Sequence, residues 1–77
     1  MPTFRIRGYI FRFYSREGTE PPHIHILRDN NQAKIWLRTL EVEYNRGFNQ
    51  KNLTQIIAIT RDNQAKFLEA WHAHFNQ

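Results

Sequence analysis

Two histidines stand two residues apart within residues 20–28, and their type and spacing offer chemistry. A β-strand repeats its side-chain direction every second residue, so His23 and His25 are expected on one face, with Ile24 and Ile26 on the other. Neighbouring positions on one face lie roughly 6.6–6.8 Å apart, which lets two imidazoles flank one phosphate as general base and general acid. The pair therefore defines a candidate site.

The chemistry predicted for this pair is RNA cleavage without a metal, because the ordinary pKa of histidine, about 6.5, lies near neutral pH. His23 and His25 would act as the acid–base pair, while Lys34 and Arg38 on the next strand would neutralise a phosphorane-like transition state. Aromatic side chains would stack a base and further arginines would bind phosphates. The expected binding residues are Tyr14, Trp36, Arg12 and Arg28.

Metal binding is an alternative, although two histidines supply only two ligands where zinc takes three or four. Glu20 is the nearest candidate for a third ligand. His72 and His74 lie about 200° apart around a helix, so they cannot both join one site. His72 is expected to pack in a partly buried position and His74 to be solvated. No metal and no cofactor is the simpler expectation.

The same residues also have purely structural interpretations. The histidines can be polar strand residues that pack partly on Trp36, and Trp36 itself can serve core or interface packing. Lys34 and Arg38 can be exposed charges that protect a sheet edge from aggregation.

Alternating sequence around the histidines predicts the strands that position them. Residues 4–7 and 9–14 alternate on either side of Gly8, which marks a turn or kink. If Asn30 and Asn31 form the next tight turn, His25 faces Trp36 and His23 faces Arg38 across a hairpin. The aliphatic residues of both strands then share one face, and the second face is expected to be solvent-accessible, basic and aromatic.

The remaining sequence predicts one short strand and then helix. Residues 39–44 alternate, and Asn49 can cap a helix with Phe48 and Leu53 as a hydrophobic staple. Apolar residues keep helical spacing beyond Asp62, which allows one kinked helix or, as we favour, two helices. The expected fold is a single α+β domain, residues 1–77, with an antiparallel sheet of three to four strands. One or two C-terminal helices pack on one face of it.

Composition limits the partners and the compartment. The 77 residues contain no cysteine, eleven Lys and Arg, and seven Asp and Glu, which give a net charge of +4. The positive charge favours polyanionic partners such as RNA, and the absence of cysteine excludes disulfides and thiolate sites. No apolar run approaches a signal peptide or a membrane span, so a cytoplasmic protein is expected. Exposed edge strands and abundant aromatic residues allow a homodimer.

The chain resembles a family of short uncharacterised prokaryotic proteins, the domain of unknown function 4160. The resemblance covers nearly the whole chain and rests on these segments: residues 1–3, 8–10, 20–25, 33–37, 47–48 and 68–72. It implies a toxin–antitoxin-like module with a cognate small partner protein, and it carries no catalytic roles. RNA is the favoured target, with a non-enzymatic interaction module as the alternative.

Residues 23–27 also resemble the start of the histidine-triad nucleotide hydrolase motif, which alternates three histidines with apolar residues. Leu27 stands where the third histidine would be. The nucleophile of that family therefore has no counterpart here.

Overall fold

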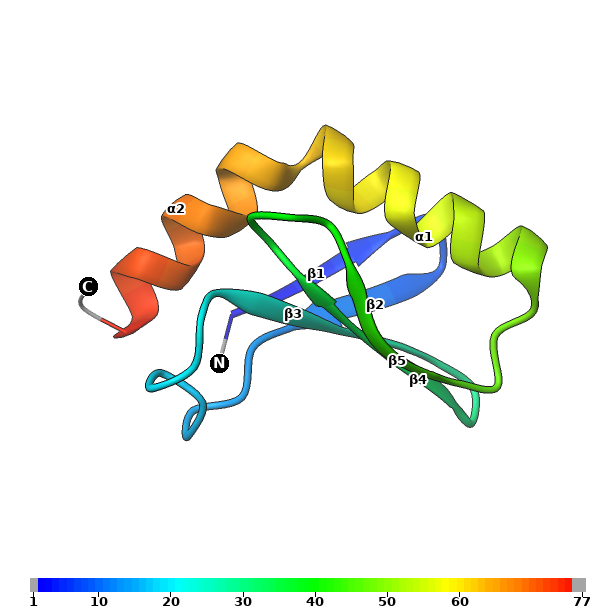
Figure 1. Ribbon diagram of the computed structural model, residues 1–77, viewed down its shortest axis with the longest axis horizontal. Helices are drawn as coiled ribbons and strands as arrows, with labels where there is room; N and C mark the ends of the chain where they lie inside the picture. The colour runs from blue at the N-terminus through cyan, green and yellow to red at the C-terminus, as the bar shows by residue number, and fades with distance from the viewer. Residues whose placement is uncertain (1, 76–77) are drawn as a thin grey trace.

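The sheet is an antiparallel meander in which every strand pairs with the next one along the chain (Figure 1). The computed structural model describes residues 2–75, and within them the sheet has five strands in the order β1 to β5, followed by two helices. The strands are β1 (Thr3–Ile6), β2 (Tyr9–Arg12), β3 (His23–Arg28), β4 (Asn31–Trp36) and β5 (Val42–Arg46). The helices are α1 (Gln50–Asp62) and α2 (Gln64–Phe75). The α+β class is confirmed. The expected domain spans residues 1–77, and the family resemblance begins at Met1. Residues 1, 76 and 77 lie outside the described part of the chain.

The expectation of three to four strands is too low because the first segment forms a complete edge strand. Arg7 and Gly8 both have positive φ, 52° and 84°, as in the tight turns whose twist matches that of a hairpin. Phe4 therefore pairs with Phe11 in regular register. The glycine marks a true reversal of the chain.

The central hairpin turns one residue earlier than predicted. Asp29 has a φ of 55° and Arg28 pairs with Asn31, so the turn is Asp29–Asn30. His23 consequently faces Trp36, and His25 faces Lys34. The register is shifted by two residues from the predicted one, and an even shift leaves every side chain on its predicted face.

A β-bulge in β5 breaks the alternation that the sequence shows. Lys34 pairs with Tyr44 while the next residue, Ile35, pairs with Val42, so Glu43 is the extra residue. Val42 packs against the core, and Tyr44 reaches the histidines on the opposite face. The bulge therefore separates two side chains that regular alternation would place together.

The core lies between one face of the sheet and the two helices, which cover that face as predicted (Figure 1). Aromatic rings supply much of its volume. Phe67 of α2 stacks on Phe11 with ring centroids 5.5 Å apart, and Trp71 meets the edge of Phe13 at 5.4 Å. Such aromatic pairs stabilise the fold by more than the burial of their surface alone. This extra stability matters in a chain that is too short for a large core.

The signals for the helix ends are confirmed. The side chain of Asn49 accepts a hydrogen bond from the backbone N–H of Asn52 at 2.8 Å, which caps α1. The two-helix alternative is correct, with the break at Asn63, whose side chain donates to the carbonyl of Ile59 at 2.8 Å. In the part of the chain that the structure describes, neither helix is long and apolar enough to cross a membrane.

Candidate metal centre

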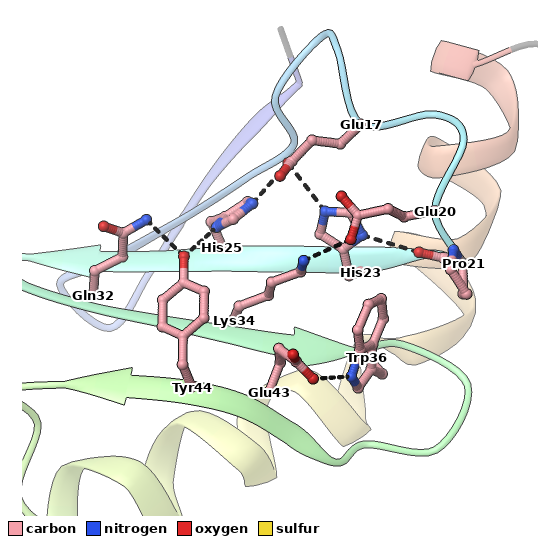
Figure 2. A network of polar contacts seen from close by, with 10 residues as sticks. All are labelled: Glu17, Glu20, Pro21, His23, His25, Gln32, Lys34, Trp36, Glu43 and Tyr44. Atoms are coloured by element: carbon pink, nitrogen blue, oxygen red, sulfur yellow. Dashed lines mark hydrogen bonds and ion pairs between the residues drawn. The ribbon is translucent and has the colours of Figure 1, made fainter.

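The predicted histidine pair lies on the face of the sheet opposite the helices. His23 and His25 leave β3 on the same side, and their ring centroids are 5.3 Å apart. Both side chains are buried, with exposed fractions of 0 % and 4 %. The prediction that this face is solvent-accessible is therefore wrong at this end of the sheet. The loop between β2 and β3, residues 13–22, folds over it (Figure 2).

Aromatic rings enclose the two imidazoles. Trp71 and Trp36 contact His23 with ring centroids 4.9 and 5.5 Å away, and the ring of Tyr14 lies 4.5 Å from that of His25. Trp36 and Tyr14, expected to stack a nucleobase, thus pack on the histidines.

Glu17 points one carboxylate oxygen from this loop at both imidazoles (Figure 2). Its Oε1 lies 2.7 Å from Nε2 of His25 and 3.0 Å from Nε2 of His23. The candidate ligand atoms of the three residues all lie within 4.8 Å of one another. Among residues 2–75, this is the group of histidine and acidic side chains close enough together to share one metal ion.

Neutral His23 is held in the tautomer that leaves Nε2 free to bind a metal. Its Nδ1 lies 2.9 Å from the carbonyl oxygen of Pro21, which can only accept, so Nδ1 carries a proton. Its Nε2 is buried and forms no hydrogen bond of good geometry, although Glu17 Oε1 is 3.0 Å away. In neutral His23, that nitrogen therefore presents its lone pair towards an anionic oxygen.

His25 takes part in a longer chain of hydrogen bonds. Its Nε2 donates to Glu17, and its Nδ1 lies 3.2 Å from the hydroxyl of Tyr44. That hydroxyl accepts from the amide of Gln32 at 3.1 Å, which leaves its own proton for Nδ1 (Figure 2). His25 is thus oriented by partners at both nitrogens.

The surroundings keep Glu17 and His25 in the charge states that metal ligands have, a carboxylate and a neutral imidazole. Burial alone would raise the pKa of Glu17, but the contacts with His23 and His25 outweigh this effect and lower that pKa. Burial also lowers the pKa of His25, against the opposite influence of Glu17. At neutral pH, Glu17 is therefore ionised and His25 neutral.

Two of the predicted residues pair with acids. Nζ of Lys34 donates to Oε1 of Glu20 at 2.8 Å, and it lies 4.7 Å from the ring centroid of Trp36. Nε1 of Trp36 donates to Oε2 of Glu43 at 2.9 Å. Glu20, expected as the third metal ligand, thus binds Lys34, and Glu17 is the carboxylate that lies beside the histidines.

The predicted arginines do not gather at the histidines. Arg38 follows β4 and is exposed, and Trp36 takes its expected place opposite His23. Arg28 lies on the helix side of the sheet, with its guanidinium 4.9 Å above the ring of Tyr9. Arg12 stays on the histidine face as the cross-strand partner of His25, and its buried Nε has no hydrogen-bond partner.

The C-terminal histidines stay outside this cluster. His74 is exposed and contacts Phe75, and His72 is half-buried on α2, as expected. Residues 2–75 contain no detectable pocket beside the cluster or elsewhere.

A family model described as "Domain of unknown function (DUF4160)" matches residues 8–72. No curated protein and no solved structure matches the chain.

Proposed function

Because the chain belongs to the family of domain of unknown function DUF4160, which names no activity, we propose a function from geometry: it binds a divalent transition-metal ion. The ligands are Glu17 Oε1, His23 Nε2 and His25 Nε2. Glu17 and its loop replace the Glu20 ligand of the earlier expectation.

One observation carries the proposal: the lone pair of His23. The Pro21 carbonyl fixes the proton on Nδ1, so Nε2 and Glu17 Oε1 face each other at 3.0 Å as two acceptors. Such a contact inside the protein is favourable only when a positive species lies between the two atoms. A proton or a metal ion fits, and the nearby Nε2 of His25 supplies a third ligand for the metal.

The distances suit coordination. An ion about 2.1 Å from each ligand places neighbouring ligand atoms about 3.0 Å apart in octahedral geometry and about 3.4 Å apart in tetrahedral geometry. The two contacts of Glu17 measure 2.7 and 3.0 Å. Small shifts of the loop would therefore be enough to seat an ion.

The ligand types define the class of ion. Two imidazoles and one carboxylate suit zinc, iron, nickel or cobalt, whereas magnesium and calcium prefer oxygen ligands. Three protein ligands leave further positions for water or an external ligand. Such an ion would act there as a Lewis acid.

The predicted metal-free RNA cleavage stays a prediction with less support. Both imidazoles are buried, and their Nε2 atoms share one carboxylate oxygen. General acid–base catalysis needs a substrate within hydrogen-bonding reach of these atoms. A toxin–antitoxin-like role and a cognate partner protein likewise stay predictions.

Metal binding to the untagged protein provides the test. We expect one zinc, nickel or cobalt ion per chain by isothermal titration calorimetry and elemental analysis. Glu17→Gln should weaken binding by about 100-fold or more, because losing a ligand costs more than the 10- to 100-fold of an outer partner. Glu20→Gln, on the same loop, should bind as the wild type does.

The two glutamates form a matched pair, since each variant removes one charge from the same loop. Equal losses in both variants would show a general effect of loop charge and refute the proposed ligand set. Full binding in a His23→Ala/His25→Ala variant would refute the proposal, because the ion would then bind elsewhere.

A further inference from the structure

A row of side chains crosses the sheet on the histidine face, two residues along β3 from His25. Cross-strand pairing joins its members in order, one from each strand: Arg5, Ile10, Leu27, Gln32 and Arg46. Neighbouring strands are about 4.8 Å apart, so the terminal arginines lie on the order of 19 Å from each other. We call these five residues the outer row.

The outer row lies away from the covered end of the sheet. Leu27 is four residues from His23 along β3, or about 13 Å, and the loop over the histidines enters β3 at His23. The helices pack on the opposite face (Figure 1). Arg5 and Arg46 are exposed, and the three residues between them are half-buried.

Lys34 on this part of the sheet is neutralised by Glu20 of the loop, and the arginines beside it are the charges available to a partner. The outer row and the adjoining row of Thr3, Arg12, His25, Lys34 and Tyr44 contain no carboxylate. Within residues 2–75, no salt bridge involves Arg5, Arg12 or Arg46. The guanidinium of Arg46 lies 4.4 Å from the ring centroid of Tyr44, which leaves an aromatic and a cationic group side by side.

We propose that the outer row, together with Arg12 and Tyr44, binds single-stranded nucleic acid through its phosphodiester backbone. Arginines at both edges of the sheet, on the order of 19 Å apart, suit phosphates a few nucleotides apart on one strand, which release counterions on binding. Half-exposed Ile10, Leu27 and Tyr44 offer apolar and aromatic contacts to unpaired bases. A single strand exposes the bases that a duplex hides, so these side chains can reach them. The proposal requires no bound metal, although Tyr44 also forms a hydrogen bond with His25.

Fluorescence anisotropy of the full chain with a labelled 12-nucleotide RNA provides the test. We expect binding, and we expect the logarithm of the binding constant to fall linearly with the logarithm of the salt concentration. Arg5→Glu/Arg46→Glu should weaken it by about tenfold or more. Lys51→Glu/Arg61→Glu changes the net charge equally on exposed positions of α1, and it should weaken binding far less.

The remaining comparisons decide between ligands. A single-stranded DNA of the same sequence shows whether the 2′-hydroxyl contributes, and binding of either strand supports the proposal. Tighter binding of duplex RNA, stronger competition by polyglutamate than by unlabelled RNA, or equal losses in both double variants would overturn it. So would an absence of binding at low salt. If the glutamate variant at the outer row unfolds, Arg5→Gln/Arg46→Gln replaces it, with Lys51→Gln/Arg61→Gln as its control.

Discussion

At the scale of single residues, Tyr44 is the hydrogen-bond partner of Nδ1 of His25. Nε2 of His25 carries the proton that it donates to Glu17, so metal binding requires this proton to leave or to move to Nδ1. The Tyr44 hydroxyl can donate to a bare Nδ1 or accept from a protonated one. Burial raises the pKa of Tyr44, so the hydroxyl keeps its proton at neutral pH. Tyr44 can therefore stabilise either tautomer.

Tyr44→Phe should lower the metal affinity by about tenfold, because an outer hydrogen-bond partner that orients a ligand contributes 10- to 100-fold. Imidazole ¹⁵N shifts should show His25 changing tautomer on metal binding in the wild type. Tyr14→Phe is the control, since Tyr14 contacts His25 through its ring. An unchanged affinity in Tyr44→Phe would exclude this role of the hydroxyl.

The sequence predicted some residues of this site and missed others. His23 and His25 were placed on one face because a strand has a fixed two-residue period. Tyr44 was missed because its alternation with Val42 hides the bulge at Glu43. Glu17 was missed because a loop has no period, and only the folded path of residues 13–22 brings it to the histidines.

At the scale of elements, α2 supports the loop that carries Glu17. A Cβ atom added to Gly18 would lie 2.5 Å from Cδ1 of Phe75, near the end of α2. Gly18 does not have positive φ, so close approach to Phe75 rather than backbone conformation explains the glycine. The residue next to Glu17 thus rests directly on the helix.

Gly18→Ala should push this loop away from the histidines and weaken metal binding severalfold, with a loss of about 1–3 kcal/mol in stability from overpacking. Adding Phe75→Ala should restore much of the affinity, because it opens the required space. Gly8→Ala is the matched control, since Gly8 has a φ of 84° and no atom within 4 Å of an added Cβ. It should destabilise the fold by backbone strain and leave metal affinity unchanged, as calorimetry and thermal unfolding can establish.

The elements themselves were more predictable than their pairing. The hairpin register was wrong by two residues, because Asn30–Asn31 and Asp29–Asn30 are both acceptable turns and burial constrains only the parity. The start of α1 was predicted correctly because Asn49 and its flanking apolar residues specify it locally. Local sequence thus determines where α1 begins, whereas tertiary packing determines which of the two hairpin turns forms.

At the scale of the whole molecule, a thin core packs on one face of the sheet and a buried polar cluster lies on the other. The chain has 77 residues and no cysteine, so disulfides cannot contribute to its stability. Burying His23, His25 and the partly exposed Glu17 costs desolvation that their mutual contacts only partly offset. A metal ion joining these groups would add stability from a source that the hydrophobic core does not supply.

Metal should therefore raise the melting temperature of the protein. An ion at 100 times its dissociation constant stabilises the folded state by about 2.7 kcal/mol. For a domain of this size, that corresponds to a rise of roughly 10–20 °C, reversed by a chelator. Differential scanning calorimetry should show this rise in the wild type and in Glu20→Gln, and not in Glu17→Gln. An equal rise in Glu17→Gln would place the bound ion elsewhere, because stabilisation through the cluster requires the carboxylate that joins both imidazoles.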